Sequence, residues 1–156
     1  MESNRRKFLA TTTGVAAAAV ALPASARAQT TAGEKPVKRV HWPGGKAPEK
    51  PVLFSPIVTL GSLVFVSGIN MPSAGDVRAQ TKAVLDEIEK RLASVGSSMA
   101  KALKVNVYLN DLSDFAAMNE MYLGRFGAEP PVRTTIASPG GIPGNSLVEI
   151  DCIAAI

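Results

Sequence analysis

Histidine and cysteine are nearly absent from this sequence of 156 residues, which contains one of each, His41 and Cys152. A single cysteine excludes a disulfide within the chain and any CxxC zinc or redox motif. A single histidine excludes metal sites built from several histidines and leaves little basis for a Ser-His-Asp triad. Because Cys152 shares its predicted strand face with apolar residues, we expect it to be a small core residue rather than a reactive thiol.

Net charge is also scarce once the N-terminus is set apart. The chain carries +4, but four of its 17 basic residues and one of its 13 acidic residues lie within residues 1–28. Residues 29–156 therefore hold 13 basic and 12 acidic groups, a net charge of +1. Recruitment of a nucleic acid by bulk charge needs a basic surface, so no nucleic-acid partner is expected. With 46% hydrophobic residues, the chain is instead predicted to bury a core in one domain.

Residues 1–28 have the features of an export signal peptide. Arg5-Arg6-Lys7-Phe8-Leu9 resembles a twin-arginine motif, and in the apolar run that follows, residues 8–22, 11 of 15 residues are Phe, Leu, Val or Ala. This run is too short to span a bilayer, which needs about 20 apolar residues. Ala26-Arg27-Ala28 supplies a cleavage pattern. We predict cleavage after Ala28, twin-arginine export to the periplasm (the general secretory route is the alternative), and no stable membrane association after cleavage.

The remaining chain divides into an arm and a domain. Residues 29–50 are polar and rich in Pro and Gly, which predicts an extended N-terminal arm. The domain is predicted over residues 51–156. Within the arm, His41-Trp42 could dock on a neighbouring part of the protein or stay unattached, and the sequence leaves both alternatives open.

Hydrophobic periodicity predicts the order strand, helix, strand, helix, strand, strand in the domain. The predicted strands cover residues 63–66, 103–110, 132–137 and 147–154. The first helix is predicted to start at Asp76 and to end by Gly96, with the i,i+4 pairs Asp86/Lys90 and Glu87/Arg91. The second is predicted to be capped by Asp111 or Ser113, to present Phe115, Met118, Tyr122 and Phe126, and to break at Pro130-Pro131. This order is typical of an α+β fold with both helices on one face of a mixed sheet.

Four polar residues could carry chemistry. Arg133 lies near the start of a predicted strand, where its guanidinium could hold a carboxylate through two parallel hydrogen bonds, or could be an ordinary surface arginine. Glu149 alternates away from its apolar neighbours and could orient a water or act as a general base, or could lie on a solvated face. Asn119 borders the apolar face of the second helix. Ser67 ends a predicted strand, where its hydroxyl could also satisfy local backbone.

Four motifs, in order along the chain, resemble the RidA/YjgF family. They are Leu60-Gly61-x3-Phe65-Val66-Ser67-Gly68, Val105-x-Val107-Tyr108-Leu109-x-Asp111-Leu112-x-Asp114-Phe115-x3-Asn119, Pro131-Val132-Arg133-Thr134-Thr135 and Leu147-Val148-Glu149-Ile150. The resemblance runs from Phe54 to Ile156, 103 residues. It implies a chorismate-mutase-like α+β fold and a homotrimer with ligand clefts between subunits. It also implies hydrolysis of reactive 2-imino and 2-enamino acids to 2-oxo acids and ammonia, with no metal or organic cofactor.

The same resemblance implies roles for individual residues. Arg133 would clamp the substrate carboxylate and Glu149 would orient the attacking water, while Ser67 and Asn119 would line the cleft. Phe54 matches a position that is commonly tyrosine, and Thr135 matches one that is often cysteine; both would contact substrate. Two hypotheses follow: a cofactor-free 2-imino acid hydrolase, or a non-catalytic module on the same trimer that binds small carboxylates or other proteins.

Overall fold

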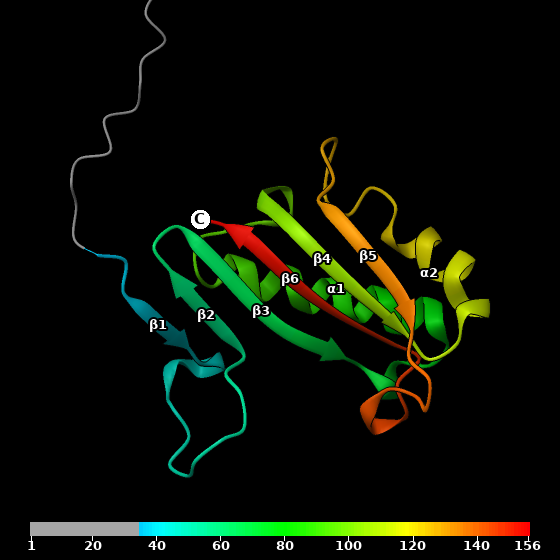
Figure 1. Cartoon of the computed structure of the whole chain (residues 1–156), viewed down its shortest axis with the longest axis horizontal. Coiled ribbons are helices and arrows are strands. Elements are labelled where there is room, and N and C mark those ends of the chain that lie inside the picture. Colours follow the sequence, from blue (N-terminus) through cyan, green and yellow to red (C-terminus); the bar gives the residue numbers. More distant parts are fainter. Residues whose placement is uncertain (1–34) are drawn as a thin grey trace, which may run out of the picture. The chain divides into compact units, whose positions relative to one another are not determined.

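One mixed sheet and two helices make up the computed structural model, which describes residues 35–156; the predicted signal peptide lies outside the described residues. The strands are β1 (Lys38–His41), β2 (Ile57–Leu60), β3 (Leu63–Asn70), β4 (Ala102–Leu109), β5 (Val132–Ala137) and β6 (Val148–Ala155), and the helices are α1 (Val77–Ala93) and α2 (Phe115–Tyr122). The strand order is β1-β2-β3-β6-β4-β5 (Figure 1). Only β4 and β5 pair in parallel; the other neighbours are antiparallel.

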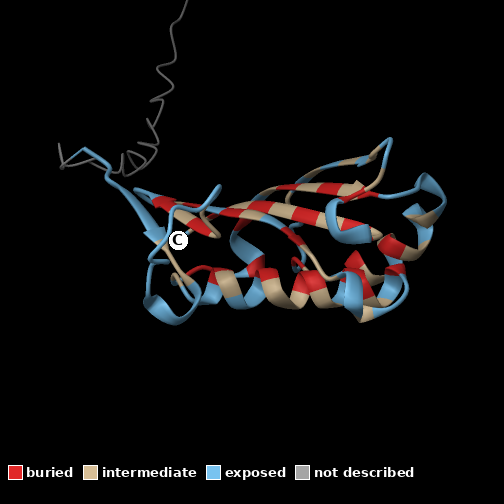
Figure 2. Cartoon of the chain, turned by 90° about the horizontal axis from the view of Figure 1, so that it is seen from below, coloured by how far each residue is buried: buried red, intermediate tan, exposed pale blue. Residues whose placement is uncertain are grey.

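Both helices cover the same face of the sheet, and Figure 2 shows the buried residues gathered between the two layers. Strands β3 and β4 are both antiparallel to β6, so α1 connects two parallel strands, as α2 connects β4 to β5. The two crossovers advance in the same direction across the sheet. Right-handed crossovers that advance in one direction place their helices on one face. The predicted α+β fold is therefore confirmed.

The core forms where α1 lies against the central strands. Its members on α1 recur at helical spacing and are fully buried, and its members on β6 alternate along the strand. They include Val84, Leu85, Ile88 and Leu92 of α1 and Val148, Ile150, Cys152 and Ala154 of β6. Burial raises the pKa of the Cys152 thiol to about 12, so it stays protonated as a small apolar group. The expectation of a core cysteine is confirmed.

The opposite face of the sheet carries no helix of the described chain, and we call it the open face. Along β4, Val105 and Val107 point into the core, while Lys104, Asn106 and Tyr108 point to the open face. On β6 the open face receives Glu149 and Asp151. These side chains interact, because Asp151 accepts hydrogen bonds from Asn106 Nδ2 at 2.8 Å and from the Tyr108 hydroxyl at 3.2 Å. The open face is therefore polar at its centre.

Strand β3 is longer than predicted. Ser67-Gly68 does not end it; instead the pairing with β6 shifts register between Val66 and Ile69, and the strand continues to Asn70. Two residues of β3 there oppose one residue of β6, which is a β-bulge. Ending the strand at the glycine was wrong because a glycine within a strand can mark a bulge as well as a stop.

Three predictions about the helices are wrong in detail. Asp86 pairs with Lys82 and Arg125 rather than with Lys90, although the predicted pair Glu87/Arg91 forms at 3.0 Å. Asp111 caps a short 3-10 turn at Leu112–Asp114 by accepting from the Ser113 backbone N–H, and α2 follows only after that turn. Helix α2 also ends at Tyr122, well before Pro130-Pro131, and Phe126 packs into the core from the loop beyond.

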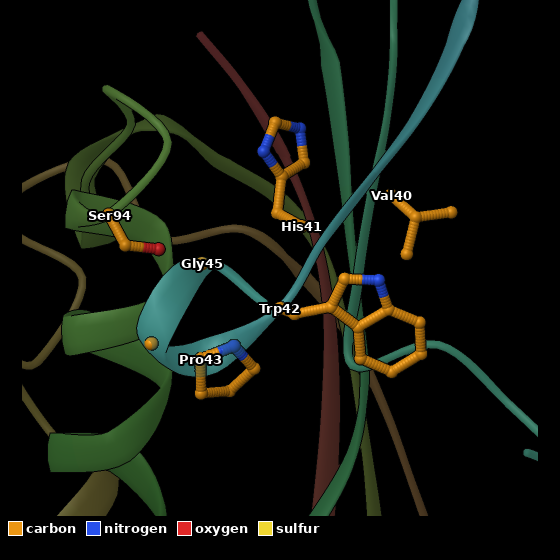
Figure 3. Close-up of a pocket in the computed structure, with 7 residues that line it drawn as sticks. Val40, His41, Trp42, Pro43, Gly45 and Ser94 are labelled. Carbon is orange, nitrogen blue, oxygen red and sulfur yellow. The ribbon is translucent and has the colours of Figure 1, made fainter. Parts of the chain in front are cut away.

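Part of the predicted arm joins the sheet. Strand β1 pairs with β2, and the His41 ring nitrogen Nε2 lies 2.8 Å from the Thr59 hydroxyl. The chain then turns through Pro43–Gly45 beside Ser94 at the end of α1, around a hollow of about 390 Å³ (Figure 3). His41 therefore docks on the neighbouring strand. Within residues 35–156, no helix is long and apolar enough to cross a membrane.

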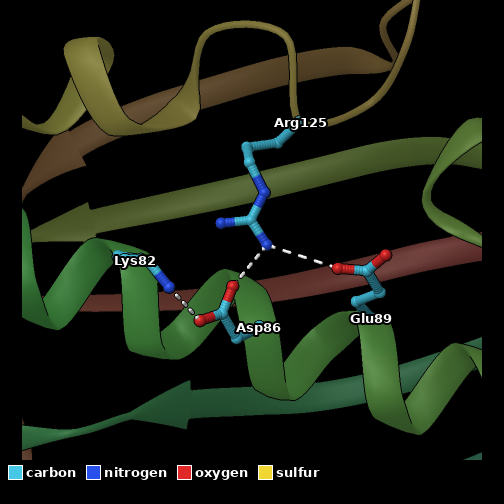
Figure 4. A network of polar contacts seen from close by, with 4 residues as sticks. All are labelled: Lys82, Asp86, Glu89 and Arg125. Atoms are coloured by element: carbon cyan, nitrogen blue, oxygen red, sulfur yellow. Dashed lines mark hydrogen bonds and ion pairs between the residues drawn. The ribbon is translucent and has the colours of Figure 1, made fainter.

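An ion-pair network fixes the loop after α2 to α1 (Figure 4). Arg125 Nη2 lies 2.7 Å from Asp86 and 3.5 Å from Glu89, and Lys82 Nζ contacts the other oxygen of Asp86 at 2.7 Å. The hydrogen bond from Lys82 and the nearby Arg125 lower the pKa of Asp86 below its ordinary value. The network holds the C-terminal end of α2 at a set position along α1.

Asp86→Asn should therefore destabilise the protein in a pH-dependent way. A lowered folded-state pKa stabilises above the unfolded pKa, and this contribution is lost as the pH falls through the folded value. Because the Asp86 side chain is 36% exposed, we expect a loss of at most about 1 kcal/mol in unfolding free energy at pH 7, fading below about pH 4. Urea unfolding at several pH values measures this difference.

Glu49→Gln is the matched control, since its pair with Lys46 is almost fully exposed and should contribute nothing measurable. An equal loss of stability for Asp86→Asn at neutral and acidic pH would contradict the assignment.

Candidate functional site

Arg133 lies on the helix-covered side of the sheet, although it is polar. Its register partner on β4 is Val105, and that of Thr135 is Val107; both valines are fully buried against the helices. Register partners in a parallel pair share a face, so Arg133 and Thr135 point toward α2. The two large apolar residues of β5, Val132 and Ile136, point to the open face instead.

The guanidinium of Arg133 stacks on aromatic rings of α2. Its central carbon lies 4.6 Å from the ring centroid of Tyr122 and 5.8 Å from that of Phe115. Such cation–π contacts contribute about 0.5–2 kcal/mol each. Within residues 35–156, no carboxylate lies at ion-pair distance from Arg133. Its N–H donors are therefore available to a ligand.

Two more predicted site residues belong with Arg133. The hydroxyl of Thr135 is buried and has no hydrogen-bond partner in the described part of the chain. Asn119 is half-buried and lies one turn from both Phe115 and Tyr122 on α2, so the three share a face. We call Arg133, Thr135 and Asn119, with these two rings, the arginine group.

Glu149 lies on the open face, with a different set of neighbours. Asn70 Nδ2 donates to its Oε2 at 3.1 Å and to the carbonyl of Pro143 at 3.2 Å. Glu149 also lines a hollow of about 160 Å³ with Tyr108 and residues of the turn after β5. Burial, and then the charge of Asp151, raise the pKa of Tyr108, so it is a neutral hydrogen-bond donor beside Glu149.

The bulge of β3 completes this second set. Ser67 and Gly68 together oppose Asp151 of β6, and the buried hydroxyl of Ser67 has no partner among residues 35–156. A Cβ added to Gly68 would collide with the carboxylate of Glu149. Glycine therefore leaves the space that Glu149 fills. We call Glu149, Asn70, Tyr108, Ser67 and Gly68 the glutamate group.

The structure thus separates the predicted site residues instead of collecting them. Arg133 and Glu149 project from opposite faces of the sheet, so one chain does not bring them together. Phe54 lies apart from both groups: its side chain is 69% exposed and lines an apolar hollow of about 460 Å³ with Trp42 and the neighbouring loop. At the end of this loop, the Ser67 backbone N–H donates to the Pro56 carbonyl at 3.1 Å, which joins the loop to the bulge.

Five residues of these groups are not among the site residues predicted from the sequence: Phe115, Tyr122, Asn70, Tyr108 and Gly68. Asn70 lies beyond the strand predicted over residues 63–66, although it pairs directly with Glu149. Tyr108 alternates with the buried valines of β4, and that alternation placed it on the outer face without indicating its neighbours. Tyr122 was assigned to the apolar face of a helix, where it does lie, and its position under Arg133 depends on the register of β5.

Metal-binding clusters are absent from the described residues. Nowhere in residues 35–156 do three or more His, Cys, Asp or Glu side chains come together in a way that could hold an ion.

Residues 44–156 match the endoribonuclease L-PSP family, which is the RidA/YjgF family. The chain belongs to this family. A RutC family protein of Pyrococcus abyssi is 36% identical over 116 residues, which cover 70% of this chain and 91% of that protein.

Other members of the RidA/YjgF family are similarly distant. Reactive Intermediate Deaminase A of Arabidopsis thaliana chloroplasts is 33% identical over 118 residues, 71% of this chain and 63% of that protein. The solved structure of a YjgF family member from Neisseria meningitidis superposes with a TM-score of 0.64 at 30% identity, over 76% of this chain and 94% of that one. The resemblance seen in the sequence is thereby confirmed at the level of family and fold.

The collision at Gly68 gives a prediction for this RidA/YjgF chain. Gly68→Ala should lower the unfolding free energy by about 0.5–1.5 kcal/mol, because the added methyl forces the Glu149 carboxylate away from Asn70 and breaks their hydrogen bond. Gly68 does not adopt a positive φ, so alanine brings no backbone strain of that kind. Urea unfolding measures the loss.

Glu149→Ala provides the control background. With the carboxylate removed, Gly68→Ala should cost nothing, or stabilise slightly by restricting the unfolded chain. The same loss in both backgrounds would contradict the collision.

Proposed function

We propose that this protein hydrolyses 2-imino and 2-enamino acids to 2-oxo acids and ammonia, with Arg133 as the carboxylate clamp. The observation that carries the proposal is the Arg133 guanidinium, stacked on two rings with no acidic partner among the described residues. A planar guanidinium with free N–H donors suits a carboxylate, which it holds through two parallel hydrogen bonds. The name of the Arabidopsis relative, a reactive intermediate deaminase, agrees with this chemistry.

The reaction needs a positioned water more than a nucleophilic side chain. An imine carbon is already electrophilic, so water oxygen adds to it while the nitrogen takes up a proton, which gives a carbinolamine. The C–N bond then breaks as the hydroxyl proton passes to nitrogen, releasing ammonia and the 2-oxo acid. In this scheme Glu149 accepts a proton from the attacking water and returns it to nitrogen. The substrate would also contact Thr135, Asn119 and Ser67, and the ring of Phe54 would form one side of the cleft.

Two copies of the chain would have to supply one cleft, since Arg133 and Glu149 project from opposite faces of one sheet. The resemblance to the family implies a homotrimer with clefts between subunits, and this geometry supports it. Apolar side chains on the open face support it further: Phe65 is 36%, Val132 66% and Ile136 49% exposed in the single chain. Burial of such residues drives association.

The leader predicted over residues 1–28 places this activity, in our proposal, in the periplasm. Substrates would then be imino acids formed or released outside the cytosol. The near-neutral charge of residues 29–156 favours a small carboxylate ligand over a nucleic acid, despite the nuclease in the family's name.

A second candidate is a non-catalytic carboxylate-binding or protein-interaction module. It is favoured by one observation: the arginine group is complete within a single chain, whereas Glu149 lies on the opposite face. A protein that only binds carboxylates needs no water-orienting group. The threonine at position 135 and phenylalanine at position 54, where the family commonly has cysteine and tyrosine, also fit this alternative.

The first prediction of the proposal concerns Arg133. An amino-acid oxidase generates 2-imino acids, and semicarbazide traps those that survive. The full chain should suppress the trapped signal, and Arg133→Ala should lose this effect. Arg133→Lys should lose most of it, because the ammonium group of lysine cannot make the two parallel hydrogen bonds of a guanidinium. We expect at least about a hundredfold loss for Arg133→Ala, in the range for a truncated charge pair.

Glu149→Gln separates the two candidates. The hydrolase requires that this variant still bind a 2-oxo acid while turnover falls. If wild type and Arg133→Ala suppress the semicarbazide signal equally, Arg133 does not hold the substrate carboxylate. Carboxylate binding by wild type without any turnover would favour the binding module.

The shared cleft predicts complementation between inactive variants. Arg133→Ala and Glu149→Gln, unfolded and refolded together in equal amounts, should regain about a quarter of the wild-type rate, because each cleft draws its two groups independently from the two variants. The coupled oxidase assay measures the recovery. Each variant refolded alone is the control, and a mixture that stays inactive would show that the two groups do not meet across subunits.

A further inference from the structure

Tyr122 forms the surface on which the Arg133 guanidinium lies, and we propose that it is a positioning residue for carboxylate binding. The inference rests on the proposed role of Arg133 and adds a residue to it. Tyr122 is 9% exposed, and its ring centroid is the nearer of the two to the guanidinium, 4.6 Å against 5.8 Å for Phe115. Phe115, at 39% exposed, is the looser second surface.

Stacking orients an arginine without using its hydrogen bonds. A guanidinium contacts an aromatic ring through its flat face, while its five N–H donors lie in the plane and point outward. An arginine held by a carboxylate would have those donors occupied. Stacking on Tyr122 therefore restricts the rotamers of the Arg133 side chain and leaves its N–H donors free to bind a ligand. Because the arginine side chain is already ordered, ligand binding costs less side-chain conformational entropy.

The Tyr122 ring is itself held firmly. It contacts the Phe126 ring at 4.9 Å between centroids, with an angle of 37° between the planes, and both side chains belong to the core cluster. The Arg125 network fixes the loop between them to α1. A ring packed in this way offers the guanidinium a surface of fixed position.

The hydroxyl of Tyr122 has a different environment from its ring. It is buried with no hydrogen-bond partner in the described chain, and burial raises its pKa to about 12, against the opposing charge of Arg133. The phenol therefore stays neutral. Because the ring face contacts Arg133, removal of the hydroxyl should leave the positioning intact, and only loss of the aromatic ring should impair it.

The test measures binding of pyruvate, as a simple 2-oxo acid, to the full chain by calorimetry. Tyr122→Phe should bind as wild type does. Tyr122→Leu should bind roughly 5- to 20-fold more weakly, the effect of losing one cation–π contact. Ile57→Ala is the control for lost core packing: it truncates a buried side chain on β2, far from β5 in the strand order of the sheet, and it should leave the affinity unchanged. Pyruvamide, which lacks the carboxylate, should be insensitive to all three variants.

A substitution that keeps the shape of the ring separates loss of the cation–π contact from loss of the folded structure. 3,4,5-Trifluorophenylalanine at position 122 keeps the ring but weakens the negative charge of its face, so binding should fall relative to Tyr122→Phe. In the Arg133→Ala background, Tyr122→Leu should have no further effect on the residual affinity.

The outcomes distinguish this inference from the proposed function. If Arg133→Ala binds pyruvate like wild type, Arg133 does not bind the carboxylate, and the proposed positioning role of Tyr122 is overturned as well. If Arg133→Ala loses binding while folded Tyr122→Leu and the fluorinated ring retain it, the clamp stands and the positioning role is overturned. Equal weakening by Tyr122→Leu with and without Arg133 would also overturn it, because that residue would then act on stability alone.

Discussion

The pairing of β6 with strands on both sides is the constraint on which the rest of the structure depends. It joins β3 to β4, and its alternation sends Val148, Ile150, Cys152 and Ala154 into the core and Glu149 and Asp151 to the open face. Because side chains alternate with a period of two, a shift of one residue would exchange the two sets. The position of Glu149 is therefore decided by the same hydrogen-bond register that builds the core.

Much of this architecture could be predicted from the sequence where periodicity was strong. The apolar residues of α1 and the alternation in β4 and β6 identified core faces and the outward direction of Glu149. The strand at residues 132–137 was predicted, but its faces could not be assigned in the same way: its large apolar residues Val132 and Ile136 face the side without helices, and Arg133 and Thr135 face the helix-covered side. An edge strand covered by a short helix reverses the usual pattern, and only the pairing with β4 identifies the faces.

The candidate site was predicted as a set of residues and not as an arrangement. The resemblance identified Arg133, Glu149, Ser67, Asn119, Thr135 and Phe54, but it did not show that Arg133 and Glu149 lie on opposite faces of the sheet. Asn70 and Gly68 act through contacts made across the bulge, and a bulge has no clear signal other than a glycine inside a strand. Tertiary pairing, not local propensity, determines these neighbours.

The central position of β6 also has a consequence for biosynthesis. It is the last of the six strands in the sequence, yet it occupies the middle of the sheet. During translation β3 and β4 therefore emerge with no strand between them, and the edges that will pair with β6 stay uncovered until β6 is made. Such edges can pair with other chains, so association of nascent molecules is favoured until β6 fills the gap.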